Sequence, residues 1–500
     1  MQSDNIERAE SIPIPAPPQK QDYLLDFVDQ YDDTSIEEHL DFINDPYMRR
    51  YARADGPTLA VSDRRDDVML EPFDGGQPHD ADELKAVENL RIAVLTKLKS
   101  PRQVDPETIY RLYQEVPESR IAHLPARLRH QLLAALGMTE RKDSKSMLRY
   151  FAVVADIRNS GFPLTSYEWN TAMSFATRYV GITGEVEIES ALRIWREMEN
   201  DAGIRANDVT FNILFDVASK AGNFNLAEMV YKEMIARGHT FNRYHHVSLI
   251  HFFGLKQNGS GVRAAYRYMV ESGEIVDTVA LNCVIASLLR CGEEDSAEHV
   301  YEKMKRSCER GRNIPDRDVT MQKYITKVLM MFARLAKKHP ELRTNFQSVA
   351  LLAPDLHTYR VLIKWYGVRL GDLSKVAQFL DEMQVFHIPL HGAIFLALFK
   401  SFGLHGGPGS DWTADRLESV WNAFLDALDT GIEGLHISTW LAMAILRAFA
   451  RISPSHDRER LLDVYEALRL RWDLDVVDTQ FMLDFLEKLL QRGRANYGRL

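Results

Sequence analysis

Three asparagines stand at corresponding places in similar segments of this 500-residue chain. Asn212 ends the segment Asp-Val-Thr-Phe-Asn, Asn282 follows it by 70 residues, and Asn170 ends the related segment Ser-Tyr-Glu-Trp-Asn. An asparagine amide offers both a donor and an acceptor, so a row of such amides could match the edges of successive nucleobases. The same side chain can instead cap a helix or bond the backbone of a neighbouring unit. The spacing alone leaves both interpretations open.

Motifs for catalysis or metal binding do not occur in the sequence. It contains no His-Glu-x-x-His, no Cys-x-x-Cys, no nucleophile elbow, no Walker motif and no dinucleotide fingerprint. Cys283, Cys291 and Cys308 have spacings of 8 and 17, which fit no zinc site. The adjacent His245 and His246 would point in different directions on a helix and make a poor metal pair. We therefore expect no enzyme, no metal site and no cofactor.

The sequence repeats with a period of about 35 residues. Gly222 and Gly292 lie 70 residues apart, as do Tyr231 and Tyr301, and Tyr266 falls midway between these two tyrosines. Within one period, apolar residues recur at three- and four-residue steps over 209–218 and again over 226–234, with a glycine-containing break between them. Each period therefore predicts a pair of helices.

A single pair of such helices cannot bury its own apolar face, whereas stacked pairs give a continuous core and a long concave surface. We therefore predict an all-α fold, a right-handed α-solenoid of stacked helical hairpins. The expected parts are a disordered acidic and proline-rich segment over 1–80, an N-terminal helical region over 81–160, a repeat core over 161–316, and degenerate C-terminal helical repeats over 317–495.

Charge is distributed unevenly along the chain. Residues 1–80 carry 19 acidic and 7 basic side chains and 8 of the 19 prolines, whereas the rest of the chain carries 52 acidic and 54 basic side chains. This composition predicts disorder over 1–80, although residues 23–28 show a short amphipathic pattern. No apolar run is long enough to span a membrane. Residues 1–30 show neither a mitochondrial transit pattern nor a secretion signal.

The repeats resemble pentatricopeptide repeats. The segment 208–212, followed by Lys220-Ala221-Gly222 and by Ala227, Tyr231, Met234 and Gly238, is one copy, and 278–304 and 166–205 hold two more. The resemblance is strong over about 161–316 and weak over 350–475. It implies binding of single-stranded RNA at one nucleotide per repeat, and a location in the mitochondrial matrix, as in fungal mitochondrial members.

The resemblance also implies which residues contact RNA. In such repeats the fifth residue of the first helix and the last residue of the unit jointly contact one base. A pyrimidine-rich preference follows from the asparagine pairs, and Val247 should read its base poorly because it cannot form hydrogen bonds. The pairs in this sequence are Asn170 with Asn207, Asn212 with Asn242, Val247 with Asp277, and Asn282 with Asp316.

We expect a sequence-selective RNA-binding adaptor that acts on mitochondrial transcripts. Its tasks would be processing, stability, translation or intron removal, including 5′-end processing of small-subunit ribosomal RNA. Mitoribosomal or RNA-processing proteins would be further partners. The near-neutral balance beyond residue 80 is poor evidence for a general nucleic-acid binder. It keeps a second interpretation open, a helical protein-binding scaffold such as a respiratory-complex assembly factor or a mitoribosome-associated component.

Overall fold

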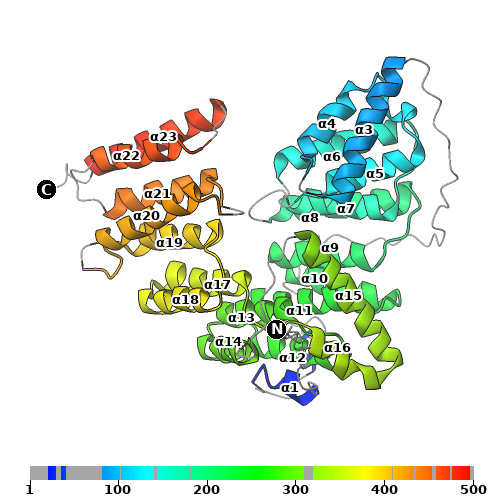
Figure 1. Ribbon diagram of the computed structural model, residues 1–500. Coiled ribbons are helices and arrows are strands. Elements are labelled where there is room, and N and C mark those ends of the chain that lie inside the picture. Colours follow the sequence, from blue (N-terminus) through cyan, green and yellow to red (C-terminus); the bar gives the residue numbers. More distant parts are fainter. Residues whose placement is uncertain are drawn as a thin grey trace, which may run out of the picture. The chain divides into compact units, whose positions relative to one another are not determined.

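The computed structural model describes residues 21–29, 35–40, 81–101, 103–139, 143–178, 183–308, 319–407, 409–432, 435–452, 458–472 and 476–495. Within these ranges all regular secondary structure is helical (Figure 1). The all-α prediction is therefore confirmed. The chain divides into two compact units: unit 1 contains 1–276 and 316–350, and unit 2 contains 277–315 and 351–500. We describe each unit by itself.

Unit 1 begins with a bundle and continues as stacked hairpins. The bundle contains α3 (Ala81–Lys99), α4 (Pro106–Glu115), η3 (Arg120–His123), α5 (Ala126–Gly137) and α6 (Ser144–Asn159). The hairpins are α7 (Ser166–Arg178) with α8 (Glu185–Arg196) and its extension η4 (Glu197–Asp201), α9 (Asp208–Lys220) with α10 (Phe224–Ala236), and α11 (Arg243–Leu255) with α12 (Gly259–Glu271).

The recurring residues of the sequence form the core of these hairpins. Ala227 and Ala265 are fully buried, as the close crossing of paired helices requires, and Tyr266 and Met269 fill the space beside them. Gly222 ends α9 with φ of 75°, a left-handed conformation that glycine adopts without strain. The helical pairs that the 35-residue period predicts are thus observed.

An inserted pair of helices lies in unit 1. It consists of α15 (Val319–Lys338), the short η5 (Pro340–Leu342) and α16 (Arg343–Val349). The Gln347 amide donates to the Val276 carbonyl at 2.7 Å and accepts from the Val276 N–H at 2.9 Å. Leu329 and Ala333 pack against Ile275. Residues 319–350, which the sequence assigned to the degenerate repeats, therefore form an insertion that interrupts the order of hairpins along the chain.

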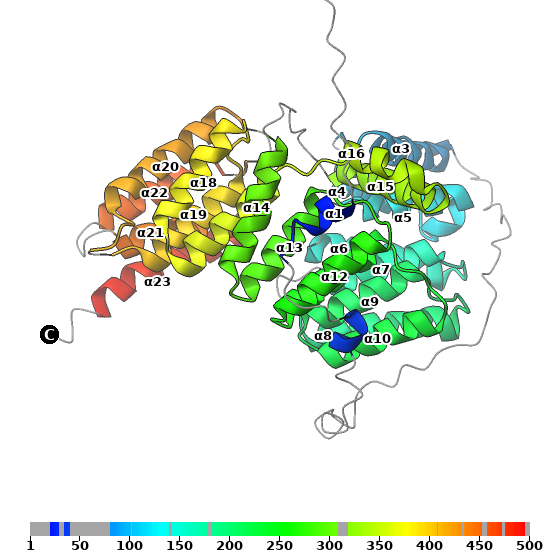
Figure 2. The same cartoon turned by 90° about the horizontal axis from the view of Figure 1, so that it is seen from below.

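Two short helices near the N-terminus pack against α12 (Figure 2). They are α1 (Gln21–Leu25) and α2 (Ile36–Leu40), and their residues Leu24, Phe27 and Ile36 are buried. The Tyr266 hydroxyl donates to the Leu24 carbonyl at 2.8 Å, and Arg263 pairs with Asp29 at 3.1 Å. Disorder was expected over all of 1–80, and these two pieces differ because their apolar side chains have a partner. The remainder of 1–80 lies outside the described residues.

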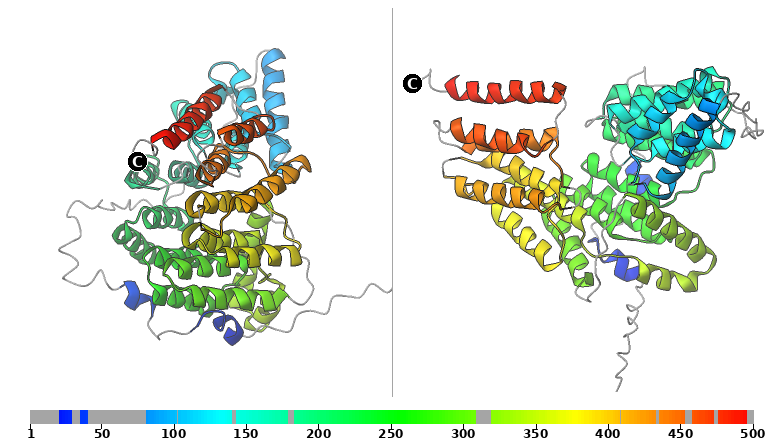
Figure 3. Two further views of the ribbon diagram at one scale, coloured as in Figure 1. Left: turned by 90° about the vertical axis from the view of Figure 1, so that its left-hand side faces the viewer. Right: turned by 45° about the horizontal axis from the view of Figure 1, so that its top comes forward.

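Unit 2 is a stack of hairpins that ends in a single helix (Figure 3). Here and in unit 1, we call the leading helix of each hairpin its first helix and the other its second helix. The elements are α13 (Thr278–Arg290), α14 (Glu294–Cys308), α17 (Leu356–Ile363) extended by η6 (Lys364–Leu370), α18 (Leu373–Val385), α19 (Gly392–His405), α20 (Ala414–Asp429), α21 (Thr439–Ile452), α22 (Arg458–Arg469) and α23 (Val476–Ala495). In the described part of the chain, no helix is both long and apolar enough to cross a membrane.

Candidate nucleic-acid interface

The residues expected at the ends of the repeat units are helix N-caps. Asn207 caps α9 and accepts from the Thr210 N–H, Asn242 caps α11 and accepts from the Tyr244 N–H, and Asp277 caps α13. Asn and Asp suit this position because their short side chains reach backbone N–H groups that have no partner within the helix. The cap places each of these side chains beside the first turn of a first helix.

In unit 1 the Asn170 amide bonds to the cap of the next hairpin. Its Nδ2 donates to Asn207 Oδ1 at 3.1 Å, and its Oδ1 accepts from the Thr210 hydroxyl at 2.7 Å. The Thr210 hydroxyl in turn accepts from the Asn207 N–H at 3.1 Å. We call this arrangement of an asparagine, a cap residue and a threonine the amide network. The expected pair of Asn170 with Asn207 is thus in direct contact.

Unit 2 repeats the amide network with different cap chemistry. Asn282 Nδ2 donates to Asp355 Oδ1 at 2.9 Å, and Asn282 Oδ1 accepts from the Thr358 hydroxyl at 2.7 Å. Asp355 caps α17. The sequence paired Asn282 with Asp316, whereas the cap residue that the Asn282 amide contacts in the structure is Asp355. Asp316 itself lies outside the described residues.

The amide network leaves little of either asparagine exposed. Asn170 is 5% exposed and Asn282 is 3% exposed, and each uses both its donor and its acceptor within the protein. A buried amide that gives up such a bond costs about 1–3 kcal/mol unless a new partner replaces it. These asparagines therefore bond the neighbouring unit, through its side chains rather than through the backbone contact that the alternative interpretation expected.

Asn212 occupies the same helix position but lacks the complete network. Its Oδ1 is buried and has no hydrogen-bond partner. The third residue of the next first helix is His245 instead of threonine, and its Nε2 contacts the Asp208 carbonyl at 3.0 Å while its Nδ1 faces the Asn242 N–H. Because this ring directs no donor at Asn212, the amide keeps an open acceptor.

The two remaining pairs differ from the expected pattern. The Asn242 amide turns away from Asn212, since its Nδ2 donates to Asp208 Oδ2 at 2.8 Å. Val247 is half-buried and presents no polar atom. Asp277 is 2% exposed and accepts from the Ala280 N–H at 3.1 Å. Of the two expected asparagine pairs in unit 1, both with described residues, Asn170 and Asn207 are in direct amide contact, whereas the Asn242 amide bonds Asp208 instead of Asn212.

A row of exposed side chains escaped the sequence analysis. Tyr167, Val209 and Tyr244 are the second residues of α7, α9 and α11, and they are 58%, 49% and 48% exposed. Each lies one turn before the residue at the fifth position, so both occupy one helix face. Trp440, the second residue of α21, is 57% exposed. The sequence analysis counted Val209 in the apolar stripe of its helix, whereas the structure leaves this side chain half exposed. We call Tyr167, Val209 and Tyr244 the platform residues.

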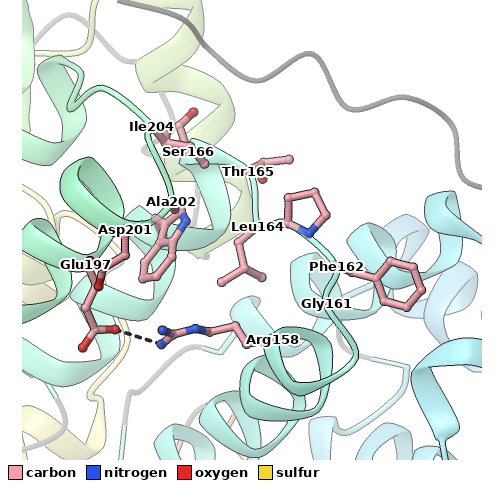
Figure 4. Close-up of a pocket in the computed structure, with 12 residues that line it drawn as sticks. Arg158, Gly161, Phe162, Leu164, Thr165, Ser166, Glu197, Asp201, Ala202 and Ile204 are labelled. Carbon is pink, nitrogen blue, oxygen red and sulfur yellow. Dashed lines mark hydrogen bonds and ion pairs between the residues drawn. The ribbon is translucent and has the colours of Figure 1, made fainter. Parts of the chain in front are cut away.

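A pocket of about 510 Å³ lies beside the start of α7 (Figure 4). Arg158 and Glu197 pair across it at 2.8 Å, and the guanidinium lies over the Trp169 ring at 5.5 Å. Asp201 also lines the pocket. The lining offers one arginine against two carboxylates and no nucleophile with an adjacent base, so it does not form a catalytic constellation.

Among the described residues, no cluster of three or more His, Cys, Asp or Glu side chains could hold a metal ion. His245 and His246 are both buried, and His246 packs edge-on against Tyr268 with ring centroids 5.0 Å apart. Burial lowers the pKa of His246 to about 3, with smaller contributions from the charges of Lys337 and His245. His246 is therefore a neutral core side chain.

Comparison with known proteins identifies the hairpins. The family model described as the PPR repeat matches residues 209–239, which cover α9 and α10, and residues 279–308, which cover α13 and α14. The chain therefore contains pentatricopeptide repeats, one matched hairpin in each unit. The expectation drawn from the sequence resemblance is confirmed for these two segments.

A chloroplastic pentatricopeptide repeat-containing protein of Arabidopsis thaliana is 24% identical over 154 residues, which are 31% of this chain and 19% of the relative. Among solved structures, maize PPR10 in complex with an 18-nucleotide psaJ RNA element aligns with a TM-score of 0.39 and 15% identity, over 92% of this chain and 61% of PPR10. Yeast Rmd9p in complex with a 16-nucleotide target RNA aligns with a TM-score of 0.37 and 13% identity, over 78% of this chain and 89% of that one. The chain thus spans about a fifth of the Arabidopsis relative and 61% of PPR10.

Proposed function

We propose that this chain is a non-enzymatic adaptor that binds single-stranded RNA along the first helices of its hairpins. One observation carries the proposal. Three successive first helices of unit 1 begin with an exposed platform residue, one turn before the residue at the fifth position of the same helix. Exposed aromatic side chains in a row suit stacking of successive unpaired bases.

In this proposal, one set of residues stacks on the bases and another set forms hydrogen bonds with the base edges. Tyr167 and Tyr244 stack bases whatever their identity, because every base has a π-face. Asn212 reads a base edge once its half-buried side chain turns outward, since its Oδ1 has no hydrogen-bond partner within the protein. Asn170 and Asn282 are less suited to reading a base, because both are buried and already bonded to Thr210 or Thr358.

The finer proposal concerns sequence preference and location. The unpaired acceptor of Asn212 can meet the imino N–H of uracil or the amino group of cytosine, but purines carry comparable donors, so the pyrimidine-rich preference rests on the resemblance of the asparagine pairs to those of pentatricopeptide repeats. The pentatricopeptide repeats and the chloroplastic relative support an organellar location. We place the protein in the mitochondrial matrix, with transcript processing, stability, translation or intron removal as its task and with mitoribosomal or RNA-processing proteins as partners.

Cross-linking in cells tests this proposal. The chain is irradiated with its bound RNA, purified under denaturing conditions, and the attached RNA is sequenced. We expect enrichment of a few organellar transcripts at pyrimidine-rich single-stranded sites, and reduced enrichment for Asn212→Ala. Recovery of RNA in proportion to cellular abundance, with the same profile for Asn212→Ala, contradicts the proposal.

A second candidate function is a helical protein-binding scaffold. The observation that favours it is the burial of Asn170 and Asn282, whose amides hold neighbouring hairpins together without any ligand. A scaffold needs those bonds and does not need the platform residues to meet a base. Binding assays on the purified chain separate the two functions. If the chain is only a scaffold, it either does not bind single-stranded RNA or binds it equally well after Tyr167→Ala and Tyr244→Ala.

A further inference from the structure

Unit 2 presents one cation on each of three successive first helices. Lys364, Lys400 and Arg447 are each the ninth residue counted from the start of α17, α19 and α21. All three are exposed. We call these three residues the cation ladder. In unit 1 the ninth residues of α7, α9 and α11 are Ser174, Asp216 and His251, so unit 1 has no equivalent row.

Packing between the first helices sets the cations side by side. Gly367 of η6 lies directly against Ser401 of α19, and the His405 imidazole Nε2 lies 2.9 Å from the Val368 carbonyl. Gly403 of α19 lies against Arg447 of α21. Lys364 and Lys400 precede the first of these contacts by three residues and one residue, so both lie near one level of the stack. The ladder therefore crosses the first helices rather than following one of them.

No carboxylate neutralises the ladder within the described ranges, where Lys364, Lys400 and Arg447 form no ion pair. Arg447 instead lies over the Phe485 ring, with its guanidinium carbon 5.1 Å from the centroid. Several cations on second helices behave differently, because they pair across hairpins. Examples are Lys305 with Glu382 at 2.9 Å, Lys375 with Glu298 at 2.7 Å and Arg460 with Glu418 at 2.6 Å.

Like charges gather around Lys364. Partial burial lowers the pKa of this lysine, and the positive charges of Lys400, Arg290 and Arg360 lower it further. Arg360 lies one turn before Lys364 on the same helix, and the Asp355 carboxylate beside Arg360 is already bonded to Asn282 and Thr358. A folded protein keeps such repulsion only at a cost in stability, which an anionic ligand removes.

We propose that the cation ladder of Lys364, Lys400 and Arg447 binds successive phosphates of one RNA strand without reading its bases. This inference rests on the proposed function and deepens it. The ladder carries one cation per hairpin, and pentatricopeptide repeats bind one nucleotide per repeat. The cations therefore recur at the same step as the phosphates of a bound strand. Trp440 lies seven residues before Arg447 on α21, and its exposed indole offers a stacking surface beside the ladder. The negative charges of an acidic protein segment are not spaced at one per hairpin.

The salt dependence of binding tests the ladder. Lys364→Gln combined with Lys400→Gln removes two exposed charges, and Arg416→Gln combined with Arg469→Gln removes two from the second helices α20 and α22 as a matched control. Affinity for single-stranded RNA long enough to cover both units is measured by fluorescence anisotropy at several salt concentrations, with a pyrimidine-rich and a purine-rich oligonucleotide. Circular dichroism checks that both variants remain folded.

We expect the ladder variant to lower the slope of log affinity against log salt by about 1.4, because each phosphate contact on a single strand contributes about 0.7. The loss should be equal for both oligonucleotides, and the control variant should keep the wild-type slope. An unchanged slope in the ladder variant, while the wild type binds RNA, overturns the ladder and leaves the proposed function standing. Absence of RNA binding by the wild type overturns both. Displacement of RNA by polyglutamate of equal charge at equal concentration overturns the assignment to phosphates and favours an acidic protein.

Discussion

The two units use one helical scaffold for two different surfaces. The first helices of unit 1 present platform residues and amides, and the one lysine of α9, Lys220, is paired with Asp216 at 2.7 Å. The first helices of unit 2 from α17 to α21 present unpaired lysine and arginine side chains instead. The amide network occurs in both units with nearly the same distances. The packing of hairpins is thus shared, while the residues that face a ligand differ between the units.

This difference suggests a division of labour. Aromatic and amide groups discriminate or stack bases, whereas cations hold the strand through a charge that every nucleotide carries. Under our proposal unit 1 supplies sequence preference and unit 2 supplies affinity that depends on salt. Four sets of substitutions break or sharpen this comparison.

The largest effect is expected for the platform residues. Tyr167→Ala with Tyr244→Ala removes two stacking surfaces and should weaken RNA binding by about 2–6 kcal/mol, since each stacked base contributes about 1–3 kcal/mol. Fluorescence anisotropy with single-stranded RNA measures the loss. The control Met229→Ala removes an apolar side chain that is 41% exposed on the second helix α10. Equal affinity of the double variant and this control would show that unit 1 does not stack bases.

A matched pair of glycines compares the folding of the units. Gly222 and Gly371 both have φ of 75°, but a side chain at Gly371 would meet the His405 ring, whereas one at Gly222 would meet open space. Gly222→Ala should cost about 1–2 kcal/mol of folding free energy, and Gly371→Ala about 2–4 kcal/mol, because a steric clash adds to the left-handed strain. Urea unfolding measures both values. Equal costs would mean that His405 moves aside freely.

The amide network should stabilise both units equally. Thr210→Val or Thr358→Val keeps the side-chain shape but removes the hydroxyl that donates to Asn170 or Asn282. Each change should lower the free energy of unfolding by about 1–3 kcal/mol, because a buried amide oxygen loses its donor. Thr96→Val serves as the control, since its hydroxyl bonds only the backbone of its own helix. A cost in one unit alone would show that the two networks are not equivalent.

Acid should destabilise unit 1 through His246. Burial holds the pKa of His246 at about 3, below the ordinary value of 6.5, so the unfolded chain binds the extra proton first. Stability is therefore fully present above pH 6.5 and falls by at most about 1.4 kcal/mol per pH unit between pH 6.5 and 3. His246→Phe should remove this part of the slope. The measurement is urea unfolding of both proteins at pH 7 and pH 5, and an identical pH dependence would contradict the assignment.

The sequence predicted the hairpins well because their signals are local. Apolar spacing, Gly222 as a helix end, and the 35-residue period all act within one or two helices, and the structure follows them. The caps Asn207 and Asn242 were recognised as special positions, although as contact residues rather than as helix caps.

The errors in the prediction arose where distant segments meet. Nothing in the order of residues shows that 319–350 leave the repeat array, so the sequence offered Asp316 as the partner of Asn282, whereas the structure shows Asp355 there. Likewise, the burial of Leu24 and Phe27 depends on α12, more than 200 residues further along the chain. The cation ladder combines single residues from three hairpins, and its spacing becomes visible only once the helix boundaries are known.

Selection of RNA from a random single-stranded library tests the division of labour most directly. The wild type, Asn212→Ala, and Lys364→Gln with Lys400→Gln are each taken through the same selection, and the bound RNA is sequenced. We predict a pyrimidine-rich motif for the wild type, a changed motif for Asn212→Ala, and the wild-type motif with weaker overall recovery for the lysine variant. The same motif with Asn212→Ala as with the wild type, or no enriched motif for the wild type, would contradict the account.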